Sequence, residues 1–177
     1  RSNLPNLKFR RIKKTMNDFE KSLKKFSNDF NAVLPSFFPY PKGSEKRVSQ
    51  AMYYSLSNGG KRLRPFLLCK TAEIFGIDKK ISLSPAVSLE MLHTYSLIHD
   101  DLPCMDNDDM RRGKLSCHKQ YDETTAVLAG DALLTRAFDV LAAEATHSDP
   151  NIRCQLIVEL ARAAGYTGMV GGQMLDM

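Results

Sequence analysis

The sequence has few cysteines, and no two of them stand close together. Cys69, Cys104, Cys117 and Cys154 form no CxxC pair among the 177 residues. This spacing argues against a disulfide framework and against a zinc site. A reducing compartment is therefore the simpler interpretation.

Long apolar runs are also missing. No stretch approaches the roughly 18 apolar residues that would indicate a transmembrane helix, and no charged start followed by an apolar core indicates a signal peptide. We therefore expect no integral membrane segment and a cytoplasmic location. The composition, 43% hydrophobic and 25% charged, suits a globular domain with a sizeable core.

Alternation of apolar and polar residues, the pattern of half-buried strands, is scarce as well. Apolar residues recur mostly at helical spacing, which predicts an all-α domain. Helices are expected over residues 8–34, 44–57, 65–75, 82–102, 122–146 and 150–170. Ser44, Asp122 and Asp149 are the expected caps, and Pro150 suits a first helical position. The helix over 82–102 is nearly all apolar, so we expect it to be buried at the centre of a bundle.

Basic residues concentrate near the start of the chain. The net charge is +5, and much of the excess lies in "KFRRIKKTMNDFEKSLKK". A solvated helix face is the favoured interpretation, with contact to a nucleic acid or a membrane as the alternative, so we expect no nucleic-acid partner. The stretch "PSFFPYPKGS" then interrupts the helical pattern. It divides residues 1–43, a basic helix and a proline-rich linker, from residues 44–177.

The stretch "HDDLPCMDNDDMRRG", residues 99–113, crowds five aspartates together. Such carboxylates repel one another and raise each other's pKa values unless a positive partner lies among them. Asp100 and Asp101 end a predicted helix, and the break at Pro103 allows Asp106 to return to the same place. Hard oxygen ligands in this arrangement suit Mg²⁺, which usually binds carboxylates together with substrate phosphates.

Two basic clusters flank these aspartates. One is "GGKRLRP", in which two glycines allow close backbone approach beside Lys61, Arg62 and Arg64, and the other is Arg111 with Arg112. His93 stands seven residues before Asp100, on the same helix face. The pattern predicts that two polyanionic groups are held close together, one by a metal ion and one by direct Lys, Arg and His contacts.

Each of these sequence features also has a simpler interpretation. The glycine-rich turn is often a loop with solvated cations, an acid-rich helix end is often a capping cluster, and His93 alone is more often a satisfied core residue. His99 beside Asp100 also resembles the His-Asp pair of metal-dependent phosphohydrolases.

Four motifs together resemble one known family. "GGKRLRP", "LEMLHTYSLIHDDLPCMDNDDMRRG", "LAGDALL" and "GGQMLD" are similar to the trans-prenyl diphosphate synthases, in the branch of bacterial-type farnesyl and plant-type geranylgeranyl diphosphate synthases. The resemblance covers about residues 44–177. It implies the all-α isoprenoid synthase bundle, usually a homodimer, and a head-to-tail 1'-4 condensation of isopentenyl diphosphate with an allylic diphosphate.

The resemblance also implies roles for individual residues. Asp100, Asp101 and Asp106 match the first aspartate-rich motif, which holds Mg²⁺ on the allylic diphosphate, with two or three ions in a complete enzyme. The matches to isopentenyl diphosphate contacts are Lys61, Arg64, His93 and Arg112, and Gly60 is a further expected substrate-binding residue. Arg111 matches a contact to the allylic diphosphate, and Gln173 and Asp176 match positions that line the cavity near the reacting carbons.

Product length follows from the same resemblance. The residue five positions before the first aspartate often forms the floor of the tail cavity in this family, and here it is Tyr95, with Ser96 beside it. An aromatic floor predicts farnesyl diphosphate as the product, unless Tyr95 is merely a packed core residue. Geranylgeranyl diphosphate synthesis and a non-catalytic subunit of a synthase are the alternatives.

The chain departs from the family pattern in several places. The second aspartate-rich motif and the Lys-Thr segment, roughly a hundred residues further on in the family, lie beyond residue 177. We therefore expect a fragment that binds diphosphates weakly and catalyses poorly or not at all. Leu115, Ser116 and Asp122 also differ from the usual residues, which concerns loop geometry more than chemistry.

Overall fold

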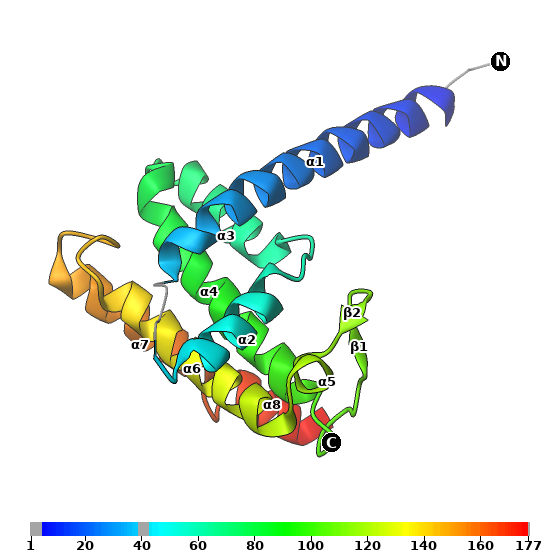
Figure 1. The fold of residues 1–177 in the computed structure, drawn as a ribbon. Coiled ribbons are helices and arrows are strands. Elements are labelled where there is room, and N and C mark those ends of the chain that lie inside the picture. The colour runs from blue at the N-terminus through cyan, green and yellow to red at the C-terminus, as the bar shows by residue number, and fades with distance from the viewer. Residues whose placement is uncertain (1–4, 39–42, 177) are drawn as a thin grey trace.

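Helices account for most of residues 5–38 and 43–176, which are the residues that the computed structural model describes (Figure 1). The helices are α1 (Pro5–Val33), α2 (Lys46–Ser57), α3 (Leu63–Ile74), α4 (Lys79–Asp100), α5 (Cys117–Gln120), α6 (Glu123–Ala142), α7 (Pro150–Ala164) and α8 (Met169–Asp176), with a 3₁₀ turn at Leu34–Phe37. Strands β1 (Met110–Arg111) and β2 (Lys114–Leu115) form a short antiparallel hairpin. The expected all-α class is confirmed. Within the described ranges, no helix has the length and apolar character needed to cross a membrane.

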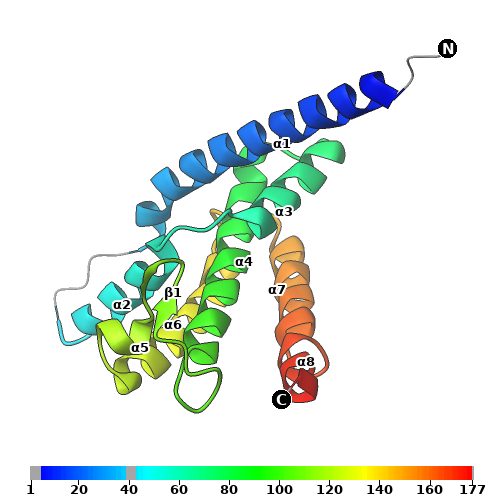
Figure 2. The same ribbon diagram turned by 90° about the vertical axis from the view of Figure 1, so that its right-hand side faces the viewer.

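Helix α4 runs through the middle of the molecule in both ribbon views (Figures 1 and 2). It packs most extensively on α6, and also contacts α3, α2 and α7. Ala86, Val87 and Met91 are fully buried, and small residues such as Ala129 on α6 let the two helices approach closely. The expectation of a buried central helix is therefore confirmed.

Gly130 of α6 faces the ring of His99 on α4. A Cβ at this position would overlap the imidazole, whereas a Cβ at Gly172 of α8 would meet nothing within 4 Å. Gly130 is the glycine of "LAGDALL", so the close contact between α4 and α6 gives this motif a packing role.

Replacing Gly130 with alanine is expected to lower the free energy of unfolding by about 1–2 kcal/mol, because the added methyl group overfills a packed contact. The matched change Gly172→Ala is expected to be neutral or to stabilise by up to about 1 kcal/mol, because alanine is the better helix former. Urea unfolding of the two variants measures the difference. Equal effects of both changes would contradict the packing role.

Capping residues set the start of two helices as expected. The Asp122 side chain accepts a hydrogen bond from the Thr125 N–H (2.6 Å), and that of Asp149 accepts one from the Asn151 N–H (2.8 Å). Pro150 takes the first position of α7. These three predictions are confirmed.

Other helix boundaries were predicted wrongly. Ser44 does not cap α2, because this helix begins at Lys46 and the Glu45 side chain instead accepts from the Gly43 N–H (3.2 Å). Helix α4 begins at Lys79 rather than residue 82, since the Asp78 side chain accepts from the Lys80 N–H (2.7 Å). The remaining differences are a start of α3 at Leu63, a start of α1 at Pro5, and ends at Asp100 for α4, Ala142 for α6 and Ala164 for α7. A turn from Gly165 to Gly168 separates α7 from α8, so 150–170 is not one helix.

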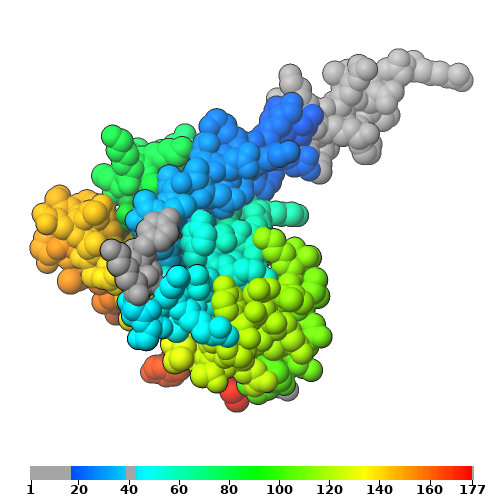
Figure 3. All heavy atoms as spheres, viewed as in Figure 1, coloured from blue at the N-terminus to red at the C-terminus, as the bar shows by residue number. Residues whose placement is uncertain are grey.

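The carboxyl half of α1 belongs to the common core. Phe30 of α1 and Leu34 of the 3₁₀ turn that follows it are buried with residues of α2, α4 and α6. The rings of Phe26 and Phe66 meet edge to face with centroids 5.4 Å apart. Figure 3 shows this half of α1 lying across the segments that follow it. The division of the chain at residues 43 and 44 stays a prediction.

Candidate active site

An apolar groove of about 640 Å³ is lined by residues of α4 on one side and of α7 and α8 on the other. Figure 2 shows how these three helices are arranged. Helix α4 contributes Leu92, His93, Tyr95, Ser96 and Asp100 to its lining, and the opposite wall includes Leu160, Ala164, Val170, Gln173 and Met174. The groove also reaches Leu89, which lies about 16 Å from Asp100 along the helix axis by the rise per residue. It is thus a long channel with a carboxylate near one end.

Asp100 forms the acidic end of this groove, and Asp106 lies near it. The chain turns back after α4, so that the Asp106 N–H donates to the Asp100 carbonyl (2.8 Å). Partial burial, followed by the charge of Asp106, raises the pKa of Asp100, while the charge of Arg111 opposes the rise. Asp106 is exposed and Asp100 half-buried, so both carboxylates are accessible from solvent. Asp106 therefore returns toward Asp100, as the sequence predicted.

Asp101 lies apart from these two carboxylates. Its side chain is 3% exposed and forms an ion pair with Arg111, whose Nε donates to Asp101 Oδ1 (2.9 Å). It lines a cavity of only about 20 Å³ together with Arg111 and Arg112, and not the groove. Within residues 5–38 and 43–176, no three Asp, Glu, His or Cys side chains lie close enough to hold a metal ion. The expected convergence of three aspartates is therefore absent here, because successive helical residues point about 100° apart and Arg111 holds the second one.

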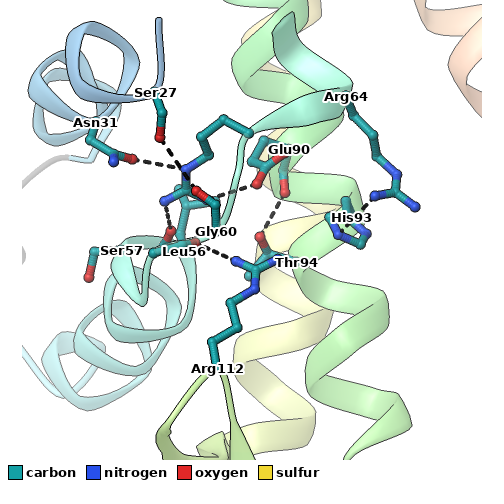
Figure 4. Close-up of polar contacts among 12 residues, drawn as sticks. Ser27, Asn31, Leu56, Ser57, Gly60, Arg64, Glu90, His93, Thr94 and Arg112 are labelled. Carbon is teal, nitrogen blue, oxygen red and sulfur yellow. Dashed lines mark hydrogen bonds and ion pairs between the residues drawn. The ribbon is translucent and has the colours of Figure 1, made fainter. Parts of the chain in front are cut away.

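A second cavity, which we call the basic pocket, adjoins the groove. It has a volume of about 540 Å³ and is lined by Gly60, Lys61, Arg62, Leu63, Arg64, Glu90, His93 and Arg112. Arg64 and His93 line both cavities. Their side chains face each other, with Arg64 Nη1 and His93 Nε2 3.3 Å apart (Figure 4). The four residues expected to contact isopentenyl diphosphate, Lys61, Arg64, His93 and Arg112, are thus brought together with Gly60.

His93 is held as a neutral imidazole. Burial and then the neighbouring charge of Arg64 lower its pKa from 6.5 to about 4, although Glu90 acts in the opposite direction. A neutral His93 accepts a hydrogen bond from Arg64 through Nε2 and does not add its own charge to the basic pocket.

The free energy of unfolding is expected to fall as the pH is lowered from about 6.5 to about 4, because the unfolded chain then binds a proton at His93 before the folded chain does. The stabilisation from neutral His93 is fully present above this window. His93→Gln removes this titrating imidazole. Between about pH 4 and 6.5, the slope of the free energy of unfolding against pH should therefore be smaller in the variant, by up to the amount that one bound proton contributes. Urea unfolding at a series of pH values tests this, and an unchanged slope in the variant would contradict it.

The remaining predicted residues lie in different surroundings. Gln173 lines the groove, but Asp176 is exposed at the end of α8 and does not. Tyr95 is 8% exposed and lines the groove, with its ring edge to face against His99 at 5.7 Å. The Ser96 hydroxyl donates to the His93 carbonyl (2.9 Å).

His99 is engaged by α6. Its Nε2 lies 3.1 Å from the Val127 carbonyl oxygen and 3.9 Å from an Asp131 carboxylate oxygen. These contacts favour a packing role for His99 over the alternative of a phosphohydrolase pair with Asp100.

Sequence reasoning treated Arg62 as one more cation for phosphate, but its side chain is buried. It pairs with Glu90, with Nη1 and Oε1 2.7 Å apart. Glu90 was missed, although an acidic residue on an otherwise apolar helix is an informative signal, since a glutamate is rarely buried without a partner. Asn31 of α1, which also contacts Arg62, carried no such signal.

The fold and the site define a predominantly helical protein in which an apolar groove, with carboxylates near one end, adjoins a cationic pocket. The model of the polyprenyl synthetase family matches residues 45–177, and the chain belongs to that family. The family resemblance stated from the sequence is therefore confirmed.

Several characterised relatives are similar to the chain. A farnesyl diphosphate synthase of Micrococcus luteus is 54% identical over 134 residues, which is 76% of this chain and 45% of the relative. A chloroplastic geranylgeranyl pyrophosphate synthase of Arabidopsis thaliana is 46% identical over 161 residues, or 90% of this chain and 44% of the relative. A solved FPP/GFPP synthase from Zymomonas mobilis has a TM-score of 0.86 and 44% identity, covering 90% of this chain and 57% of its own. The chain spans about half the length of the curated relatives it matches.

Proposed function

We propose that this chain carries the substrate site of a trans-prenyltransferase that condenses isopentenyl diphosphate with dimethylallyl and geranyl diphosphates to farnesyl diphosphate. One observation carries the proposal: the basic pocket and the apolar groove meet at Arg64 and His93. Such a junction suits two diphosphate substrates whose reacting carbons must lie close together, one of them with an apolar tail in the groove.

The basic pocket is the proposed site for the diphosphate of isopentenyl diphosphate. Lys61, Arg64 and Arg112 supply positive charge, and Gly60 has no side chain to obstruct approach to its backbone. Neutral His93 accepts a hydrogen bond from Arg64 and so helps to hold that side chain in the pocket. Arg111 is assigned to the allylic diphosphate, and Gln173 and Asp176 stay predictions as residues near the reacting carbons.

Asp100, Asp101 and Asp106 are the proposed ligands of Mg²⁺. Two of the three donors fit this ion in the described structure, because carboxylate oxygens are the ligands that it prefers and because Asp100 and Asp106 are near enough for the charge of one to raise the pKa of the other. Asp101 is available only when its ion pair with Arg111 opens. When bound, Mg²⁺ supplies positive charge that stabilises a departing diphosphate.

The chemistry assigned to the site has three steps. The allylic C–O bond ionises as Arg111 draws negative charge onto the leaving diphosphate. The alkene carbon of isopentenyl diphosphate then bonds to the allylic cation, which its fixed position beside the groove favours. The resulting cation loses a proton to the departed diphosphate, which restores a double bond.

Tyr95 is the basis for proposing a C15 product. Its buried ring lines the groove five residues before Asp100, about 7.5 Å along the helix, where it limits the length of the tail. Geranylgeranyl diphosphate synthesis is the second candidate, because the plant relatives of similar identity carry that name. A non-catalytic subunit stays an alternative.

Product chain length tests the proposal. The protein encoded by the complete reading frame is supplied with dimethylallyl diphosphate, isopentenyl diphosphate and Mg²⁺, and the products are identified by mass spectrometry. A C15 product is expected. A C20 product would retain the reaction and overturn the role of Tyr95, and no product with substrates still bound would favour the non-catalytic subunit.

A homodimer is also proposed, since α6 exposes Val127 (40%) and Leu128 (48%) side by side. Light scattering coupled to gel filtration measures the mass directly. The cytoplasmic location and the weak catalysis expected of residues 1–177 alone stay predictions.

A further inference from the structure

Arg62 is a buried cation between two exposed ones. It is 2% exposed, whereas Lys61 and Arg64 face solvent. Its backbone is left-handed, with φ 51° and ψ 37°, immediately before the first residue of α3. Residues other than glycine seldom adopt this conformation, and those that do are often found where a function requires it. The unusual backbone turns the Arg62 side chain into the body of the protein.

The guanidinium of Arg62 is hydrogen-bonded to three helices at once. Its Nε donates to Asn31 Oδ1 of α1 (2.9 Å), its Nη1 to Glu90 Oε1 of α4 (2.7 Å), and its Nη2 to the Leu56 carbonyl of α2 (2.6 Å) (Figure 4). Hydrogen bonds between charged groups are the stronger ones, and a planar guanidinium fixes the direction of each. The loop that carries Arg62 is thereby fixed relative to α1, α2 and α4.

Two further contacts attach the glycines of the same loop. Ser27 of α1 donates to the Gly60 carbonyl (3.4 Å), and Arg112 donates to the Gly59 carbonyl. A Cβ at Gly60 would overlap the Arg112 guanidinium. The position of the loop therefore also sets the position of Arg112, which belongs to the basic pocket.

The positive charge of Arg62 also affects the basic pocket, through Glu90. Glu90 lines the basic pocket and is 3% exposed as a side chain, so its negative charge would repel an anionic ligand there if it were unpaired. The ion pair with Arg62 neutralises Glu90. The charges of Lys61, Arg64 and Arg112 are then left for the ligand.

We propose that Arg62 is a positioning residue for the diphosphate of isopentenyl diphosphate, and that α1 supports this site through Asn31. The identity of the substrate rests on the proposed function above. Arg62 itself does not contact the ligand; it holds the backbone that presents Lys61, Arg64 and Arg112. Asn31 lies outside the residues matched by the family model, so this support comes from a segment to which the sequence assigned no function.

The most informative variant is Asn31→Ala, which removes one acceptor and leaves the Arg62–Glu90 pair intact. The Michaelis constant for isopentenyl diphosphate is expected to rise about threefold to tenfold, the equivalent of about one hydrogen bond. The Michaelis constant for the allylic diphosphate and kcat at saturation should change by less than about twofold, because the acidic end of the groove is untouched. Asn31→Asp keeps an oxygen acceptor and should restore the wild-type values.

The matched control is Asn28→Ala on the same helix. Asn28 is exposed, and no hydrogen bond joins its side chain to another residue in the described part of the chain. Thermal unfolding of both variants shows whether a general loss of stability explains any change. All enzymes are prepared from the complete reading frame.

A second pair of variants tests Arg62 directly. Arg62→Lys keeps the charge but has one nitrogen in place of a three-donor fork, so a rise of more than about tenfold in the same Michaelis constant is expected. Where this variant fails to fold, Arg62→Met combined with Glu90→Gln removes both charges and leaves no buried ion unpaired. That double variant should show the same selective rise.

Binding of inorganic diphosphate without divalent metal, followed by calorimetry, separates this proposal from the proposed function. Weaker binding by Asn31→Ala than by Asn28→Ala supports positioning even if no prenyl product forms, in which case only the proposed function fails. The positioning role is overturned if the wild-type protein makes product while Asn31→Ala and Asn28→Ala have the same Michaelis constant for isopentenyl diphosphate and the same affinity for inorganic diphosphate. An equal rise in the Michaelis constants of both substrates would also overturn it.

Discussion

Asp100→Asn is expected to lower kcat by about a hundredfold to a thousandfold, the usual cost of removing one group that stabilises developing charge in a transition state. Asp100 is the carboxylate that lines the groove, and asparagine has a similar shape without the negative charge that would hold a cation. Steady-state kinetics with saturating Mg²⁺ and both diphosphates, on the protein from the complete reading frame, measure the loss.

Stability distinguishes this effect from misfolding. The pKa of Asp100 is raised by burial and by Asp106, so the folded protein carries an unfavourable charge at this position. The variant should therefore unfold at the same or a higher temperature than the wild type, a trade-off often found at active sites. The control is Asp109→Asn, whose side chain is 66% exposed and, among the described residues, forms an ion pair only with Lys119 at the surface. Equal kcat values for the two variants would contradict the assignment.

Tyr95→Ala is expected to change the main product from C15 to C20 or longer. The substitution removes a ring that lines the groove about 7.5 Å along the helix from Asp100, and the space that it leaves admits a longer tail. Mass spectrometry of the extracted products, at equal conversion, gives the distribution of chain lengths.

Tyr95→Phe is the control for this change. It keeps the aromatic ring and removes only the hydroxyl, so C15 should remain the main product. An unchanged distribution in Tyr95→Ala would show that the ring packs against His99 without limiting the tail. A change in Tyr95→Phe as large as that in Tyr95→Ala would assign the effect to the hydroxyl.

Local signals in the sequence predicted most of the helices. Asp122 and Asp149 cap the next residues in the chain, and such short-range contacts need no knowledge of the fold. The face shared by His93 and Asp100 was also predictable, because both lie on one regular helix, and both line the groove. Ser44 was misjudged because the neighbouring Glu45 competes for the same turn.

The hairpin at 110–115 was missed for a different reason. Each strand has two residues, which is too short for an alternating pattern. The turn between them has φ values of 55° at Arg112 and 79° at Gly113, as in the tight turns that usually carry Asn-Gly or Asp-Gly. Arginine in the first of these positions is an unusual signal, and the sequence interpretation treated it only as a charge.

Pairings between distant side chains were beyond sequence reasoning. Arg62 and Arg111 were both counted as cations available to phosphate, yet Glu90 holds the first and Asp101 the second. Composition and spacing give the number of charges near a site. Which arginine faces the ligand and which is neutralised by a carboxylate depends on how α1, α4 and the hairpin meet in space.

Under the proposed function, the ion pair between Asp101 and Arg111 would couple two binding events. In the described structure the two side chains are hydrogen-bonded to each other, and Arg111 also lies 3.5 Å from an Asp108 carboxylate oxygen. If the proposed roles hold, a diphosphate bound to Arg111 would free Asp101, and a cation bound to Asp101 would free Arg111. Thermodynamic reciprocity would then require each ligand to raise the affinity of the other by the same factor. In the absence of ligands, Arg111 compensates the charge of the buried Asp101 carboxylate. The ligand-free protein therefore avoids the cost of an unpaired buried charge.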